Sequence, residues 1–151
     1  MRKHLTLQRW GERFLGGFKY VVAGYMMLAG IATVFAPADQ TVSGIAQVVY
    51  STHIGLIVAG IIIFISGTVL LVGKIKRNKT LTGRGLLYCY LCFLFAAILN
   101  AAAYGDPTTW IGNLVMAIIL GVLYLRWKFK TQYVNPRHFI NDTMSMRNER
   151  K

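Results

Sequence analysis

Hydrophobic residues form two long blocks along the chain, and basic residues flank and separate these blocks. Residues 20–73 and 85–125 contain no Lys or Arg, whereas residues 2–19, 74–84 and 126–151 contain all of them. A helix that spans the hydrocarbon core of a bilayer needs about 20 apolar residues at a rise of about 1.5 Å per residue. Each block therefore predicts two membrane spans joined by a short turn.

Turn signals divide each block near its middle. Residues 36–41 read Ala-Pro-Ala-Asp-Gln-Thr and residues 104–109 read Tyr-Gly-Asp-Pro-Thr-Thr, and Pro and Gly interrupt helices. The predicted fold class is an all-α integral membrane protein, a four-helix bundle. We expect its spans near 18–36, 50–73, 86–104 and 109–126.

Composition and charge support a membrane protein and indicate its orientation. The 151 residues are 55% hydrophobic and 15% charged, with 17 Lys and Arg against five Asp and Glu, and the mean hydropathy is +0.47. These values exclude a disordered chain and argue against a water-soluble globule. Lys and Arg are retained in the cytoplasm, and four spans place all three basic segments on one side. We predict a multi-pass protein of the cell (inner) membrane with both termini in the cytoplasm.

Aromatic residues occur where the predicted spans meet the two membrane interfaces, as Tyr and Trp commonly do. The outer belt is expected to contain Tyr50, Tyr104 and Trp110, and the inner belt Tyr20, Tyr88, Tyr124 and Trp127.

The start of the chain also resembles a secretory signal peptide. A basic leader and the apolar run 20–35 are followed by Ala36-Pro37-Ala38, a small-residue motif similar to a cleavage site. Cleavage would leave three spans with the termini on opposite faces. The length of the leader and the proline inside the motif favour an uncleaved first span.

The first 19 residues predict an amphipathic helix. Leu7, Trp10, Phe14 and Phe18 recur at three- and four-residue spacing, and most of the cations lie elsewhere on the helical wheel. Such a helix lies in the inner interface, with its aromatic side chains at the acyl boundary. A basic topology anchor without another role is the alternative. The expected domains are this helix over 1–19, the bundle over 20–126 and a basic cytoplasmic tail over 127–151.

Basic side chains beside the spans predict the lipid bilayer, with anionic headgroups, as a partner. Each well-placed cation contributes about 1 kcal/mol to such binding. The tail is too sparsely charged to predict a nucleic-acid partner. The expected headgroup contacts are Arg2, Lys3, Arg9, Arg13, Lys19, Lys74, Lys76, Arg77, Lys79, Arg126, Lys128 and Lys130.

Two amides inside the second hairpin predict an interhelical contact. Asn100 lies about a turn before the hairpin and Asn113 about a turn after it, so an antiparallel pair places them at the same depth. A hydrogen bond between them contributes roughly 0.6 to 2 kcal/mol. His53 and Asp106, near the outer surface, are candidates for a polar vestibule with the two amides. A single His without a second ligand predicts no metal site, and we expect no cofactor.

Small residues recur at positions that let helices approach closely. They predict packing within the bundle or between subunits, and the pattern does not decide which. These residues are Gly17 with Gly24, Gly60 with Gly67, and Ala117 with Gly121.

Cys89 and Cys92 form a Cys-x-x-Cys pair on one face of the third span. Thiol redox or lipid-linked chemistry is one interpretation. A reducing cytoplasm and the lack of a cation beside the thiols favour two inert cysteines instead.

The order of segments resembles that of the DoxX-like small four-helix membrane proteins. Residues 67–73, Gly-Thr-Val-Leu-Leu-Val-Gly, close the second span and are followed by a basic turn, an apolar third span and a fourth that opens with Asn113. The resemblance covers residues 20–125, and the acidic residue often found in that family's second helix is absent here. It implies a compact bundle that acts as an accessory in a membrane complex. Size, basic tail and glycine-rich spans also resemble phage holins, which oligomerise into lesions.

These observations predict a non-enzymatic membrane protein that packs with itself or serves as an accessory subunit of a membrane complex. No set of acids, bases or metal ligands of the kind an enzyme needs is visible in the sequence. The alternatives are an oligomeric, holin-like pore and a thiol-based activity through Cys89 and Cys92.

Overall fold

The chain is helical throughout the part that the computed structural model describes, which is residues 2–39, 46–104 and 107–133, and no strand occurs in that part. The predicted all-α class is confirmed, and four of the described segments are long and apolar enough to cross a membrane. The helices are α1 (Arg2–Val34), α2 (Gln47–Tyr50), α3 (His53–Ile75), α4 (Lys79–Tyr104) and α5 (Pro107–Tyr133). The candidate spans are Arg13–Val34, His53–Ile75, Lys79–Tyr104 and Trp110–Phe129.

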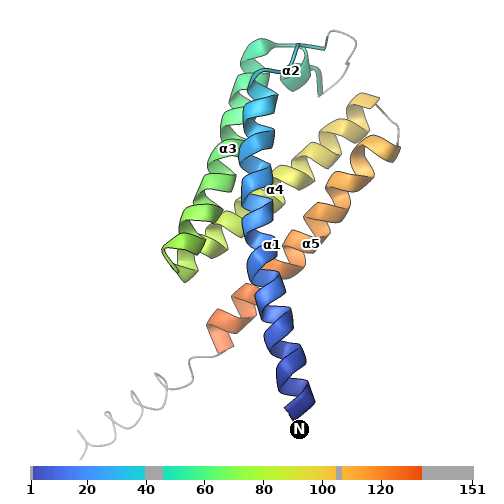
Figure 1. Cartoon of the computed structure of the whole chain (residues 1–151). Helices are drawn as coiled ribbons and strands as arrows, with labels where there is room; N and C mark the ends of the chain where they lie inside the picture. The colour runs from blue at the N-terminus through green and yellow to red at the C-terminus, as the bar shows by residue number, and fades with distance from the viewer. Residues whose placement is uncertain (1, 40–45, 105–106, 134–151) are drawn as a thin grey trace, which may run out of the picture.

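The first helix differs from the expected arrangement. We expected a separate helix over 1–19, but α1 continues from Arg2 to Val34 without a break (Figure 1). Gly16 and Gly17 lie where the basic part meets the apolar part, but no proline lies beside them and the helix continues through both. Its 33 residues correspond to about 50 Å of helix, against a hydrocarbon core of about 30 Å. The interfacial position of residues 1–19 stays a prediction.

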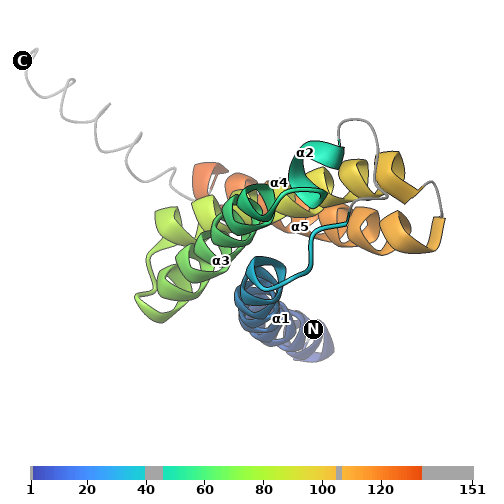
Figure 2. The ribbon, with the colours of Figure 1, turned by 90° about the horizontal axis from the view of Figure 1, so that it is seen from above.

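The helices form two pairs that are inclined to each other. α1 packs on α3, α4 packs on α5, and α3 joins the pairs by packing on α4. The pairs lie close together near the turn between α3 and α4 and diverge toward the other end, where α2 lies (Figures 1 and 2).

The main hydrophobic core fills the half of the bundle in which the helices converge. Residues from all four long helices contribute to it, and the side chains of Leu70, Leu86 and Leu120 are fully buried. The buried members are Val22, Ala23, Met26, Leu70, Leu86, Cys89, Phe93, Ala117, Leu120 and Leu123. The diverging half has no comparable core among the described residues, and a cavity lies there instead.

Glycines set the distance between α1 and α3. A Cβ atom at Gly60 would lie 2.6 Å from the carbonyl oxygen of Gly30, and one at Gly30 would lie 2.7 Å from the carbonyl oxygen of Gly60. A Cβ atom at Gly67 would lie 2.8 Å from the carbonyl oxygen of Ala23. Contacts this short require that the positions carry no side chain, so the helix backbones touch directly.

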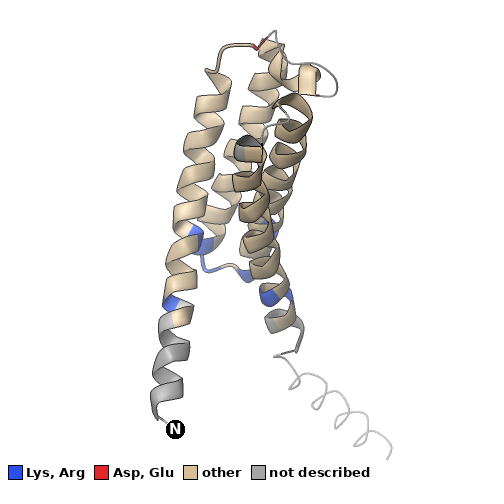
Figure 3. Ribbon diagram, turned by 90° about the vertical axis from the view of Figure 1, so that its right-hand side faces the viewer, with Lys and Arg blue, Asp and Glu red and all other residues tan. Residues whose placement is uncertain are grey.

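The basic residues and Asp39 lie at opposite ends of the described bundle. Lys and Arg lie toward the end that contains the α3–α4 turn (Figure 3). Asp39 lies at the other end, where its N–H donates to the Tyr50 carbonyl and its carboxylate accepts from the Tyr104 hydroxyl. The ammonium of Lys74 lies 5.4 Å from the ring centroid of Tyr20, and the rings of Tyr124 and Trp127 stack at 5.9 Å at the same end. We call the end that contains the α3–α4 turn the basic end, and the opposite end the Asp39 end.

Candidate functional site

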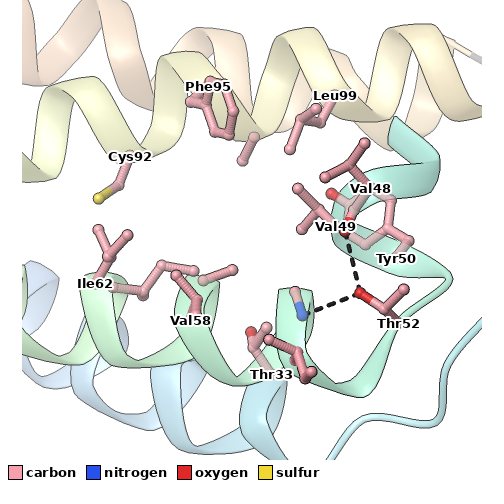
Figure 4. Close-up of a pocket in the computed structure, with 15 residues that line it drawn as sticks. Thr33, Val48, Val49, Tyr50, Thr52, Val58, Ile62, Cys92, Phe95 and Leu99 are labelled. Carbon is pink, nitrogen blue, oxygen red and sulfur yellow. Dashed lines mark hydrogen bonds between the residues drawn. The ribbon is translucent and has the colours of Figure 1, made fainter. Parts of the chain in front are cut away.

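An apolar cavity of about 810 Å³ lies between α3 and α4 in the diverging half of the bundle. Its volume falls in the range of small-molecule sites, roughly 300–1,000 Å³. Figure 4 shows α3 and α4 on opposite sides of it and α2 at one end. The lining residues are Thr33, Val48, Val49, Tyr50, Thr52, Ile54, Gly55, Val58, Ala59, Ile62, Ile63, Cys92, Phe95, Ala96 and Leu99.

Thr52 and Gly55 position α2 against the start of α3. The Thr52 hydroxyl accepts a hydrogen bond from the Gly55 N–H at 3.1 Å, as an N-cap residue does, and donates one to the Val48 carbonyl at 3.2 Å (Figure 4). A Cβ atom at Gly55 would lie 2.5 Å from the Val48 carbonyl oxygen and 2.7 Å from that of Val49. α2 can therefore rest on α3 because residue 55 is glycine.

The cavity opens onto the exposed surface of α3 and α4. Phe95 on α4 is 56% exposed and Ile62 on α3 is 54% exposed, although both line the cavity. A second apolar hollow of about 350 Å³ shares Ile62, Cys92 and Phe95 with the first. The two form a continuous apolar groove on the α3–α4 side, which we call the α3–α4 groove.

Polar groups gather at the Asp39 end of the groove. The Tyr50 hydroxyl donates to the Asn100 side-chain oxygen at 2.7 Å, and the Tyr104 hydroxyl donates to the Asp39 carboxylate at 3.2 Å. The Asp39 N–H donates to the Tyr50 carbonyl at 2.8 Å, and the rings of Tyr50 and Tyr104 lie 6.3 Å apart. This polar mouth links the loop after α1 to α2 and to the end of α4.

The hydrogen bond from Tyr50 to Asn100 is expected to persist into alkaline solution. Burial, followed by the nearby Tyr104, raises the pKa of Tyr50 above its usual value. A raised pKa means that the contribution of Tyr50 to stability is complete below the pKa of an unfolded tyrosine and is lost as the pH rises above it.

We therefore expect Tyr50→Phe to lower the free energy of unfolding by about 1 kcal/mol at neutral pH. The loss should shrink as the pH rises above the pKa of an unfolded tyrosine, because the wild-type chain then loses the same contribution. Thermal unfolding in mild detergent across this pH range checks it. Tyr88→Phe is the control, since Tyr88 is an exposed tyrosine on α4. Equal effects of the two substitutions at every pH would contradict the assigned role of Tyr50.

The structure gives Asn100 a contact that the sequence did not indicate. Its side-chain oxygen accepts from Tyr50, which is 50 positions earlier, and the predicted hydrogen bond with Asn113 stays a prediction. His53 is exposed and begins α3, so it lies at the Asp39 end as expected. Asp106 lies outside the described residues, and the vestibule that included it stays a prediction.

The small residues singled out from the sequence fall into two groups. Gly60 and Gly67 contact α1 closely, Ala117 is buried, and a Cβ atom at Gly121 would lie 3.3 Å from the ring of Tyr90 on α4. These residues pack within the bundle. In contrast, a Cβ atom at Gly17 or Gly24 would meet nothing within 4 Å in the described part of the chain.

Small residues recur at heptad spacing on two faces of α1, and only one of these faces packs on α3. Ala23 and Gly30 contact α3, whereas the predicted pair, Gly17 and Gly24, lies on another face. The signal for Ala23 and Gly30 was present in their spacing of seven residues. The sequence does not specify how α1 is rotated about its own axis, and this rotation decides which face contacts α3.

The two cysteines both contact Ser66 of α3. The Cys89 thiol donates to the Ser66 carbonyl at 3.6 Å, and the Cys92 sulfur lies 3.3 Å from the Ser66 hydroxyl. Both are free thiols, and Cys89 is buried. These contacts fit a packing role, and the redox interpretation stays an untested prediction. No group of three His, Cys, Asp or Glu side chains that could hold a metal ion occurs among the described residues.

The predicted headgroup-binding cations that the structure describes are all at the basic end (Figure 3). Arg13, Lys76 and Arg77 are exposed, and Lys74 and Lys19 are half-buried. The side chains of Arg2, Lys3, Arg9 and Lys130 lie outside the described part, as does the tail from residue 134 onward.

Comparison with known proteins gives no relative for this chain. No protein family, curated protein or solved structure matches it. Functional assignment therefore rests on the residues and their geometry alone.

Proposed function

We propose that this chain is a non-enzymatic, multi-pass membrane protein that acts by packing against a second copy of itself through α1. The contact surface, which we call the outward face of α1, carries apolar and small residues at alternating spacings of three and four. Its members are Phe14, Gly17, Val21, Gly24, Leu28 and Ile31.

Exposure of this face is the observation that carries the proposal. Phe14 is 72% exposed, Val21 69% and Leu28 70%, and nothing described lies within 4 Å of a Cβ atom at Gly17 or Gly24. The face of α1 that contains Ala23 and Gly30 is already occupied by α3. A seven-residue repeat of apolar positions is the pattern by which two helices pair, and glycine on it allows close approach in lipid.

The length of α1 favours contact of this face with a second copy of the chain over contact with lipid. The same spacing continues in the sequence to Trp10 and Leu7, and α1 is about 20 Å longer than the hydrocarbon core. The predicted interfacial position would cover these residues only if the helix bent near residue 19. Since α1 has no break there, pairing with another α1 explains the apolar face along its whole length.

The proposed orientation places the basic end in the cytoplasm of a cell (inner) membrane, where its cations contact anionic headgroups. Separation of Lys and Arg from Asp39 along the bundle supports this orientation. A partner membrane protein on the outward face of α1, as the resemblance to DoxX-like proteins implies, is the competing assignment.

Oxidative cross-linking in the membrane tests the proposal. Val21→Cys and Leu28→Cys, each in a Cys89→Ala, Cys92→Ala chain, are expected to form a disulfide-linked dimer in high yield, because equivalent positions face each other in a symmetric helix pair. Val115→Cys is the matched control, since Val115 is 48% exposed on α5 and lies on another surface. Gel mobility without reductant is the measurement.

Three outcomes would contradict self-packing through α1. One is equal cross-linking at residues 21, 28 and 115, which indicates random collision. Another is the recovery of residues 21 and 28 cross-linked only to a different protein, which supports an accessory subunit. The third is oligomers larger than a dimer in mild detergent together with dye release from cells, which supports the holin-like alternative.

A further inference from the structure

We infer that the α3–α4 groove binds an acyl chain of a phospholipid from the leaflet at the Asp39 end, and that the polar mouth selects a lipid whose headgroup carries a cationic ammonium group. The groove lies on α3 and α4, away from the outward face of α1, so this inference is independent of the proposed self-association.

The depth of the groove matches one leaflet. Its lining begins at Thr52, at the Asp39 end, and extends along α3 to Ile63, which is a rise of about 16 Å. Half of a typical hydrocarbon core is about 15 Å. An acyl chain that enters through the exposed side of the groove, below α2, would reach its inner end near the bilayer midplane.

The lining chemistry fits a hydrocarbon chain. On both sides the groove presents aliphatic and aromatic side chains, such as Val58 and Ile62 on α3 and Phe95 and Leu99 on α4 (Figure 4). The hydroxyl of Thr33 donates back to the Ala29 carbonyl of its own helix at 2.8 Å. The polar atoms in the deeper part are thus few, and none of the described residues that line the groove is Lys, Arg, His, Asp or Glu.

A partner helix fits less well than a lipid chain. An α-helix with its side chains is about 10–12 Å across, whereas the groove is closed at one end by α2, which packs on α3 and contacts Leu99 of α4. A spanning helix would have to pass the place that α2 occupies. A lipid needs only to insert its chain below α2.

Charge at the mouth favours a headgroup with a cationic ammonium group over an anionic headgroup. The Asp39 carboxylate lies there and accepts a hydrogen bond from the Tyr104 hydroxyl, while the backbone N–H of Asp39 donates to the Tyr50 carbonyl. The two blocks of sequence that reach this end, 20–73 and 85–125, contain no Lys or Arg. A carboxylate next to two tyrosine rings attracts an ammonium group and repels a headgroup with net negative charge.

Photocross-linking in vesicles tests the inference. The full-length chain is reconstituted in equal parts of phosphatidylcholine and phosphatidylglycerol with a trace of one probe. The three probes are phosphatidylcholine with a diazirine on its acyl chain, phosphatidylglycerol with the same chain, and the free diazirine fatty acid. Labelled residues are identified by peptide mass spectrometry.

We expect the phosphatidylcholine probe to label the α3 and α4 peptides around Ile62 and Phe95 about tenfold more than the exposed face of α5 at Ile118, a ratio that corresponds to about 1.4 kcal/mol. Ala96→Phe, which fills the groove, should remove this excess. Ala102→Phe should keep it, since Ala102 is an exposed alanine on the same helix that does not line the groove. Ala59→Phe fills the groove from α3 and replaces Ala96→Phe if that variant does not fold.

Asp39→Asn tests the headgroup preference separately. It should lower labelling by the phosphatidylcholine probe to the level of the phosphatidylglycerol probe, a loss of about fivefold, while labelling stays in the groove. Uniform labelling of all lipid-facing helices would overturn the inference. So would groove labelling that Ala96→Phe and Ala59→Phe leave unchanged, or equal labelling of the wild-type groove by all three probes. Cross-links from the groove to a second copy of the chain would assign the groove to a protein partner instead.

Discussion

Replacing Gly60 by valine is expected to separate α1 from α3 and to lower the free energy of unfolding by about 3 kcal/mol. A Cβ atom at this position would lie 2.6 Å from the Gly30 carbonyl oxygen and 2.6 Å from a methyl group of Val34. The carbonyl oxygen belongs to a helix backbone and cannot rotate away. The two helices must therefore move apart, and the direct backbone contact along their length is lost.

The matched control for this substitution is Gly112→Val on α5. A Cβ atom at Gly112 meets nothing within 4 Å in the described part of the chain, so the change tests valine in a helix without the steric clash. We expect thermal unfolding in mild detergent to give a midpoint close to that of the wild type for Gly112→Val and a much lower one for Gly60→Val. Similar midpoints for both variants would show that α1 and α3 do not approach as closely as the structure has them.

Combining Gly30→Val with Gly60→Val tests the contact between the two positions separately from the helix propensity of valine. Gly30 and Gly60 face each other, since a Cβ atom on either would collide with the carbonyl oxygen of the other. Once Gly60→Val has separated the helices, Gly30→Val should cost less than it does in the wild type. Strict additivity of the two losses would indicate that the positions do not share a contact.

The spans could be predicted from the sequence because cations are excluded from hydrocarbon so strongly that their positions alone divide the chain. α3 begins at His53 and ends at Ile75, close to the predicted 50–73. The prediction for α1 was less accurate, because its basic part is as able to form a helix as its apolar part. Gly16 and Gly17, where the two parts meet, lower the helix propensity there but do not end the helix.

Which face of each helix packs inside could not be predicted from spacing alone. On α1 both Gly17 with Gly24 and Ala23 with Gly30 recur at seven residues, and only the second pair contacts α3. In lipid the outward side of a helix is as apolar as the inward side, so hydrophobicity does not distinguish the two faces. Small residues indicate that helices approach each other but not which helices do so.

The α3–α4 groove had no signature in the sequence. It exists because the two helix pairs diverge and because α2, only four residues long, rests on Gly55. The inclination of the pairs depends on contacts between residues far apart in the chain. Tyr50, Tyr104 and Asp39 were each expected near the outer surface, but their mutual hydrogen bonds follow from how the loop after α1 meets α2 and α4.

The central claim is that all three basic segments lie on one side of a membrane that the chain crosses four times. Side-specific labelling tests it directly, with single cysteines introduced into a Cys89→Ala, Cys92→Ala chain. Lys76→Cys reports the α3–α4 turn, Lys151→Cys reports the carboxyl end, and His53→Cys reports the Asp39 end; Lys76 and His53 are exposed. A charged maleimide that does not cross membranes is added to intact cells or after the membrane is opened.

We expect each cysteine to react either fully or not at all in intact cells. Moving a cation-rich segment through hydrocarbon is too costly for a mixture of two topologies. His53→Cys should react in intact cells, and Lys76→Cys and Lys151→Cys should react only after the membrane is opened. Reaction of residues 76 and 151 from opposite sides would contradict four spans, and with them the assignment of the basic end to one face of the membrane.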